Sequence, residues 1–188
     1  MTEPLFSRDA LSYKADDVVA GRYRITGVVG RGGFGAVYAA EHTGTQQAVA
    51  LKMLTTSGAD DTEAIARFYR EARITAGLSS PHTVRVFDVD RAKNGPLFIA
   101  MELLKGPTLE QVLKRLEAAQ RIMSEQQTLQ IAISILSSLA EAHAAGLVHR
   151  DLKPANVILS HVPGSDPVVK VLDFGCSRTV DSDLTLEG

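Results

Sequence analysis

Short stretches of β-branched and small apolar residues alternate with glycine-containing turns in the first half of the chain. Three of them cover residues 23–29, 36–41 and 47–53, and each has the length and composition of a strand. Residues 83–89 and 97–103 repeat the pattern on either side of Asn94-Gly95, a dipeptide that favours a tight hairpin turn. The pattern predicts an antiparallel sheet of five strands.

One helix interrupts the strands, and helices dominate the second half of the chain. Residues 60–78 have apolar side chains at helical spacing, and a second such pattern begins at Leu109. Ser124 and Gln127 match a capping box ahead of the apolar segment 131–148. That segment reaches the length of a membrane span, but Glu141 and His143 lie inside it, and hydrocarbon would penalise them. We interpret it as a buried helix of a soluble protein.

The change from strands to helices divides the chain. It predicts an α+β fold of two lobes, with an N-terminal extension at 1–22, a strand-rich lobe at 23–104, and a hinge plus the start of a helical lobe at 105–188. The hinge falls near Gly106-Pro107. Clefts between lobes are common nucleotide sites, so we expect the functional residues to converge there.

Composition narrows the function classes. The 188 residues are 45% hydrophobic with a net charge of −2, which favours a globular protein and offers no basic surface for nucleic acid. The single cysteine, Cys176, cannot form an internal disulfide, and residues 1–20 lack the features of a signal peptide. We expect a cytoplasmic protein with no membrane segment in this chain, and an anchor beyond Gly188 is compatible with that expectation.

Three glycines follow the first predicted strand. Gly30, Gly32 and Gly35 match the spacing G-x-G-x-x-G, which lets backbone amides approach a polyphosphate. The same spacing fits a dinucleotide-binding turn or a plain flexible hairpin. A dinucleotide-binding turn requires a helix directly after the glycines, whereas residues 36–39 have the pattern of another strand.

A lysine and a glutamate are candidates for a buried charge pair. Strand alternation places Ala50 and Lys52 on one face, where the small residue leaves room for a flat base and the lysine reaches toward phosphate oxygens. A lysine that extends along an edge strand to solvent is the alternative. Glu71 lies within the mainly apolar helical stripe of Ala64, Phe68, Thr75 and Leu78. An unpaired charge there is costly, so Lys52 is its expected partner.

The string from His149 to Asn156 carries the most specific chemistry. Phosphoryl transfer to a hydroxyl needs a proton acceptor, a cation for the migrating charge and oxygen ligands for Mg²⁺. Asp151, Lys153 and Asn156 supply these groups in turn. A charged surface turn is the alternative interpretation. The strand at 168–172 ends at Asp173, whose carboxylate we expect to be the principal Mg²⁺ ligand.

These motifs, in this order, resemble the protein kinase superfamily from about Tyr23 to the end of the chain. Lys153 resembles serine/threonine rather than tyrosine kinases, and the overall style resembles the bacterial, Hanks-type branch. The resemblance implies a kinase-like bilobal fold, ATP and Mg²⁺ as cofactors, and a protein substrate with Ser or Thr. It implies catalytic roles for Lys52, Glu71, Asp151 and Lys153, and metal ligation by Asn156 and Asp173. The implied nucleotide-binding residues are Val29, Gly30, Arg31, Gly32, Gly33, Phe34, Gly35, Val37, Ala50, Lys52, Met101, Glu102, Leu104 and Ile158.

Two further expectations come from the resemblance. Arg150 beside Asp151 resembles kinases that are activated when a phosphate in the activation loop pairs with this arginine. Ser182 and Thr185 are the candidate phosphorylation sites, although both are also ordinary loop residues. Related kinases continue beyond the position of Gly188. We therefore expect a fragment that exposes an apolar surface on segment 131–148 and is inactive alone. The competing hypothesis is a nucleotide-binding or scaffold remnant that transfers no phosphate.

Overall fold

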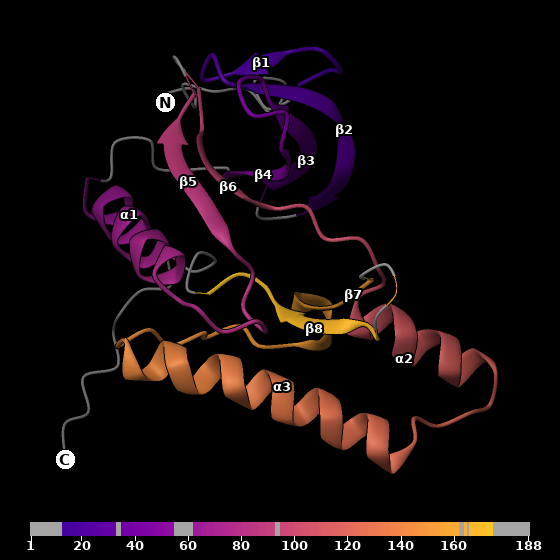
Figure 1. Ribbon diagram of the computed structural model, residues 1–188. Helices are drawn as coiled ribbons and strands as arrows, with labels where there is room; N and C mark the ends of the chain where they lie inside the picture. The colour runs from indigo at the N-terminus through magenta and orange to yellow at the C-terminus, as the bar shows by residue number, and fades with distance from the viewer. Residues whose placement is uncertain are drawn as a thin grey trace, which may run out of the picture.

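The computed structural model describes residues 13–32, 35–54, 62–92, 95–161, 164 and 166–174. Within this part of the chain, a curled antiparallel sheet forms one lobe, and two helices with a small two-stranded sheet form the other (Figure 1). The large sheet has the strand order β1-β2-β3-β4-β6-β5. Its strands are β1 (Val18–Val19), β2 (Tyr23–Gly32), β3 (Gly35–His42), β4 (Ala48–Leu54), β5 (Val86–Arg91) and β6 (Leu97–Glu102).

The sheet of the described residues has six strands, so the predicted number of five is wrong by one. The additional strand is β1, which pairs with the start of β2 and lies in the segment expected to be an extension. Two residues are too short to show the alternation by which strands are detected. Arg22, between these strands, forms ion pairs with Asp88 and Asp90 of β5 at 2.7 Å each, and so links the two outer parts of the curled sheet.

Alternation along the strands separates a buried core from the inter-lobe face. Ala36, Tyr38 and Ala40 of β3 are buried in one cluster with Leu51 of β4 and Phe98 of β6. Their neighbours in sequence point to the opposite side. Register confirms the predicted face of β4, because Ala50 pairs with Met101 and Lys52 pairs with Val37 and Ile99. Lys52 is only 7% exposed, which excludes the solvent-directed lysine.

The helix of the first lobe, α1 (Thr62–Ala76), packs against β5. It ends before Gly77, close to the predicted end at residue 78. Residues 77–85, which we call the α1–β5 linker, then cross to the second lobe before β5 begins. The linker therefore connects the helix that carries Glu71 with β5, which pairs with β6, the strand that precedes the hinge.

The second lobe begins with two capped helices. α2 (Leu109–Ala118) has a capping box of Thr108 and Gln111, and α3 (Glu125–Ala144) has the predicted one of Ser124 and Gln127. The short helix η2 (Pro154–Asn156) follows, and then β7 (Val157–Ser160) and β8 (Val168–Val171), which pair antiparallel. No helix in the described ranges has the length and apolar character needed to cross a bilayer.

The interpretation of segment 131–148 as a buried helix is only half right. The buried residues of α3 are small: Ser134, Ser138 and Ala142. Leu129, Ile133 and Leu136 are each more than half exposed, in agreement with the expected apolar surface. The helix also ends earlier than predicted, because Gly146 adopts the left-handed conformation (φ 75°) that terminates helices.

Candidate active site

A short connection joins the two lobes and forms the floor of the candidate site. After Glu102 the chain passes over β7, where Leu159 N–H donates to Pro107 O (3.0 Å) and His161 N–H donates to Lys105 O (2.7 Å). Gly106 lies between these two bonds with φ 152°. The predicted hinge is thus a backbone segment bonded to the strand that carries Ile158, and Ile158 itself bridges to Thr108.

The central charge pair of the site joins the two lobes. Lys52 Nζ of β4 lies 2.6 Å from Asp173 Oδ1, which follows β8. The lysine side chain is 9% exposed and the aspartate side chain 25% exposed. Two residues that are 121 positions apart in the sequence therefore meet at one point, as the two-lobe hypothesis requires.

Asp151 lies in a network with the other two residues of its loop. Lys153 Nζ lies 2.8 Å from Asp151 Oδ2. Asn156 Nδ2 donates to the backbone oxygen of Asp151 (2.8 Å) and to Oδ2 (3.1 Å). These bonds, with the Lys153 bond as the largest cause, lower the pKa of the Asp151 carboxyl below its ordinary value. The carboxylate is therefore ionised at neutral pH and can accept a hydrogen bond.

His149 connects this loop to the strand of Asp173. Its Nε2 lies 2.7 Å from Leu172 O, a pure acceptor, so Nε2 carries the proton. Nδ1 then accepts from Asp151 N–H at 3.3 Å. The ring is buried at 3% exposure and packs on Phe174 with a centroid distance of 4.9 Å. Sequence reasoning assigned His149 no role, and only its place at the head of the motif could have indicated one.

Local backbone geometry also brings the metal-binding candidates together. Leu172 N–H donates to Asn156 O at 2.9 Å, so the residue before Asp173 is bonded to Asn156. Arg150 and Asp173 both have positive φ, 59° and 58°, a conformation that costs a residue with a side chain about 1–2 kcal/mol. Arg150 lies next to the proposed functional residue Asp151, and Asp173 is itself a proposed functional residue. Backbone strain of this kind is commonly found at functional sites.

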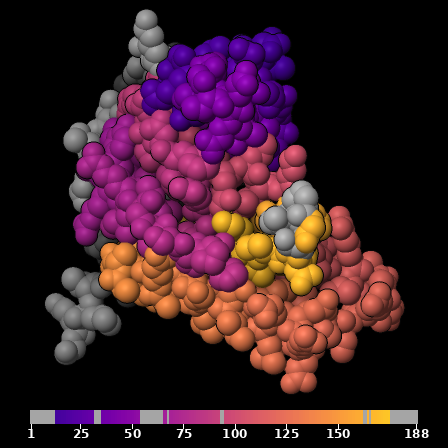
Figure 2. Space-filling view, viewed as in Figure 1, coloured from indigo at the N-terminus to yellow at the C-terminus, as the bar shows by residue number. Residues whose placement is uncertain are grey.

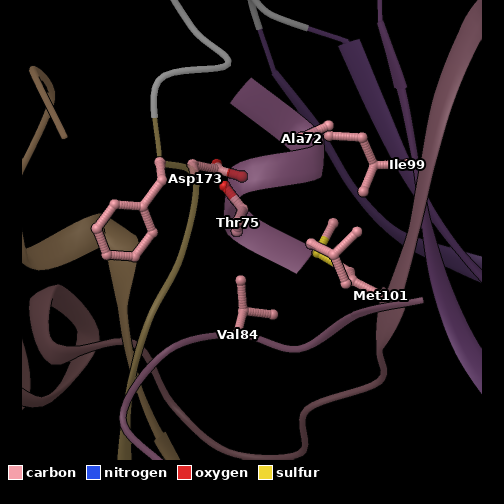
Figure 3. A pocket seen from close by; sticks show the side chains of 8 residues that line it. Ala72, Thr75, Val84, Ile99, Met101 and Asp173 are labelled. Atoms are coloured by element: carbon pink, nitrogen blue, oxygen red, sulfur yellow. The ribbon is translucent and has the colours of Figure 1, made fainter. Parts of the chain in front are cut away.

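A small apolar pocket lies behind the charge pair. Figure 3 shows Thr75 of α1 and Asp173 facing one another, with Val84 and Met101 on the opposite wall. Thr75 Oγ1 donates to Glu71 O at 2.9 Å, which satisfies the Thr75 hydroxyl within the mainly apolar stripe. The lining residues are Ala72, Thr75, Val84, Val86, Ile99, Met101, Asp173 and Phe174.

An apolar cluster beside the hinge contains part of the predicted base-binding set. Ala50, Val84 and Met101 form a buried cluster, against which Val37 and Leu104 pack. Glu102 begins the hinge, and Ile158 lies on β7 opposite Lys170. Four of the residues that we expected around a nucleotide base, Val37, Ala50, Met101 and Leu104, therefore lie in one apolar cluster beside the hinge.

The glycine segment is a hairpin between two strands. Gly30 pairs with Val37, Arg31 with Ala36 and Gly32 with Gly35 across β2 and β3. Because a strand follows the glycines, the dinucleotide-binding turn is excluded. Val29 is 56% exposed on this hairpin. Several predicted residues lie outside the described part of the chain: Gly33, Phe34, Cys176, Ser182 and Thr185.

Comparison with known proteins decides the family. The model of the protein kinase domain matches residues 23–187. This chain belongs to the protein kinase family. Its relatives include the serine/threonine-protein kinase pkn3 of Myxococcus xanthus, 38% identical over 87% of this chain, and the serine/threonine-protein kinase PknH of Mycobacterium tuberculosis, 37% identical over 89%. The kinase-family chain spans 29% and 26% of the length of these two relatives.

Solved structures agree with this assignment. The crystal structure of the Mycobacterium tuberculosis PknI kinase domain matches 89% of this kinase-family chain with a TM-score of 0.76 and 30% sequence identity, and the chain covers 64% of it. The fold of the chain is therefore the bilobal kinase fold that the motifs predicted, with one more strand in the sheet than expected.

Proposed function

We propose that this chain forms the ATP site and part of the phosphoryl-transfer site of a bacterial serine/threonine protein kinase. The observation that carries the proposal is the 2.6 Å contact of Lys52 with Asp173, next to the hydrogen-bonded group of Asp151, Lys153 and Asn156. A cation, two carboxylates and an amide oxygen between two lobes are the groups that positioning and charge stabilisation of a phosphoryl group require.

The metal would be held by Asn156 and Asp173. The Nδ2 group of Asn156 is occupied by Asp151, so the amide is oriented with Oδ1 as its remaining acceptor. The described residues contain no group of three or more His, Cys, Asp or Glu side chains suited to a metal. The two oxygen donors of Asn156 and Asp173 fit Mg²⁺, which keeps several waters and is held by one or two protein groups plus substrate phosphates. When bound, Mg²⁺ would neutralise phosphate charge.

Asp151 is the proposed acceptor of the hydroxyl proton. Its lowered pKa keeps it ionised at neutral pH, and an ionised carboxylate can orient a substrate Ser or Thr hydroxyl by accepting its hydrogen bond. Lys153 Nζ, 3.1 Å from Oδ1 and 2.8 Å from Oδ2, brings a positive charge to the position where the migrating phosphoryl group would pass.

The nucleotide would lie between the glycine hairpin and the hinge. Lys52 would contact its phosphate oxygens, and its pairing with Glu71, one turn before the pocket residue Thr75 on α1, remains a prediction. Val37, Ala50 and Ile158 would enclose the base, with Met101 behind it and the backbone of Glu102 and Leu104 beside it. The apolar cluster of Ala50, Met101, Val37 and Leu104 supports this placement.

Transfer of labelled phosphate from γ-labelled ATP to casein, by the full-length gene product with Mg²⁺, tests the proposal. We expect incorporation by the wild type and its near abolition in Asp151→Asn. Asp166→Asn, which makes the same change at an exposed position outside the site, should retain it. Equal incorporation by Asp151→Asn and wild type would refute the assigned role. If Mg²⁺–ATP raises the melting temperature but no label is transferred, the remnant without transfer activity is the better description.

A further inference from the structure

An ion pair outside the phosphate site connects the hinge with the second lobe. Lys170 Nζ of β8 lies 2.7 Å from Glu102 Oε1, at the end of β6. The same ammonium group donates to Thr83 O at 3.2 Å. The two side chains are only 15% and 25% exposed, so solvent screens the pair much less than a surface pair.

Glu102 is also bonded to the start of β5. Its Oε1 accepts from Arg85 N–H at 2.8 Å, and its own N–H donates to Arg85 O at 2.9 Å. One carboxylate oxygen therefore holds Lys170 and the Arg85 backbone together. Through these bonds the hinge, the α1–β5 linker and β8 share a single charged junction.

The α1–β5 linker is also hydrogen-bonded to β8 near this junction. Val84 N–H donates to Val171 O (2.9 Å), and Val171 N–H donates to His82 O (2.7 Å). His82 Nδ1 also donates to Val169 O at 3.0 Å. The linker is therefore bonded to β8 in the manner of an added strand of the small sheet.

Helix α3 holds the other side of the linker. The buried hydroxyls of Thr83 and Ser138 lie 2.7 Å apart. Glu141 accepts from the backbone N–H groups of Ser79 and Ser80, at 2.7 Å each. The space-filling view shows the surface of the α1 region resting on that of α3, with the segment of β8 beside it (Figure 2). The junction of Lys170 is thus anchored to the second lobe from two directions.

The strand that carries Lys170 leads straight to the functional carboxylate. Asp173 is three residues after Lys170, and Val171 between them makes both of the backbone bonds described above. Loss of the Lys170 ammonium would leave the part-buried Glu102 carboxylate with fewer partners. The resulting shift at the hinge would be passed along β8 to the Lys52–Asp173 contact.

We propose that Lys170 is a positioning residue that sets the distance between the hinge and Asp173 through Glu102, without touching the nucleotide. The inference rests on the proposed function, because it concerns the geometry of that same ATP site. It predicts that neutralising Lys170 weakens Mg²⁺–ATP binding by about 3- to 10-fold, the range expected for a coupling carried by packed and bonded elements. Lys170→Arg, which keeps the charge, should bind within about twofold of the wild type.

Calorimetric titration of the purified protein with ATP in excess Mg²⁺ gives the test, using Lys170→Met, Lys170→Arg and the double variant with Glu102→Gln. The matched control is Lys114→Met, which removes an exposed pair with Glu110 (3.4 Å) on α2 and should bind like the wild type. The double variant should bind Mg²⁺–ATP no more weakly than the single variant with the lower affinity, because both changes disrupt the same junction. Hydrogen exchange at the amides of Val84, Arg85 and Val171 should accelerate in Lys170→Met, and that of β2–β3 should not.

The outcomes separate the two proposals. A wild type that does not bind Mg²⁺–ATP contradicts the proposed function. A wild type that binds, with equal affinity in Lys170→Met and unchanged exchange at the three amides, contradicts the positioning role alone. Should Lys170→Met fail to fold, Glu102→Gln decides the matter, because it preserves the side-chain shape while removing the charge that pairs with Lys170.

Discussion

Gly106→Ala is predicted to destabilise the connection between the lobes by a collision of backbone with the new Cβ. An alanine Cβ at this position would lie 2.1 Å from Leu159 O and 3.0 Å from Leu159 C. Because ordinary contacts begin near 3.4 Å, the hinge and β7 would have to separate by about 1 Å at this point. Both atoms belong to the backbone, so no side-chain rotation can relieve the clash.

The magnitude follows from what that separation breaks. The bonds of Leu159 N–H to Pro107 O and of His161 N–H to Lys105 O flank the clash, and each contributes about 1 kcal/mol. The φ of 152° adds about 1–3 kcal/mol for a residue with a Cβ. We expect the free energy of unfolding to fall by about 3–5 kcal/mol, a large part of the usual total of about 5–15 kcal/mol.

Urea denaturation followed by circular dichroism measures this loss. Gly146→Ala separates strain from collision, since Gly146 has φ 75° but open space around the position of a Cβ. It should lose only about 1 kcal/mol. If the free energy of unfolding of Gly106→Ala lies within about 0.5 kcal/mol of the wild-type value, the hinge does not pack on β7 as described.

Three further predictions concern single side chains. Lys52→Met should weaken Mg²⁺–ATP binding more than tenfold by calorimetry, as loss of a charge-assisted contact to phosphate implies, and Lys114→Met should not; equal affinities would contradict the assignment. Lys153→Met should raise the pKa of Asp151 toward its ordinary value in an NMR titration, because Lys153 is the largest cause of the lowering. The lowered pKa contributes stability to the fold at pH values above the ordinary pKa, and this stability is lost as the pH falls through the pKa of the folded state. An unchanged pKa of Asp151 in Lys153→Met would show that the lowering has another cause. Glu141→Gln should lower the free energy of unfolding by about 1–3 kcal/mol, since charged acceptors of two N–H groups are lost, whereas a stability equal to wild type in urea would show that α3 does not hold the linker.

Local patterns predicted those parts of the fold that depend on local physics. Strand alternation placed Ala50 and Lys52 on the inter-lobe face, and the capping box identified the start of α3 at Ser124. The sixth strand escaped because its two residues, Val18 and Val19, become a strand only through pairing with β2. The exposed apolar side of α3 was expected only through the resemblance to longer kinases, since apolar composition alone does not say which face a neighbour covers.

Long-range partners were the hardest part of the site to predict. The pairing of Lys52 with Glu71, expected because a carboxylate in an apolar stripe needs a cation, stays a prediction. The direct contact of Lys52 with Asp173 was not predicted, because periodicity along one helix says nothing of a carboxylate that arrives from the other lobe. Glu141 and Lys170 carried no local signal, because their partners are defined only by the docking of the α1–β5 linker.

The metal dependence of ATP binding tests the central claim most directly. Asp173 and Asn156 are proposed to hold Mg²⁺ together with the phosphates, next to Lys52. Calorimetric titration of ATP with and without Mg²⁺ should therefore show tighter binding with the metal for the wild type. Asp173→Asn should lose most of that increment and keep its metal-free affinity. An Asp173→Asn variant that Mg²⁺ helps as much as the wild type would contradict a single site shared by nucleotide and metal.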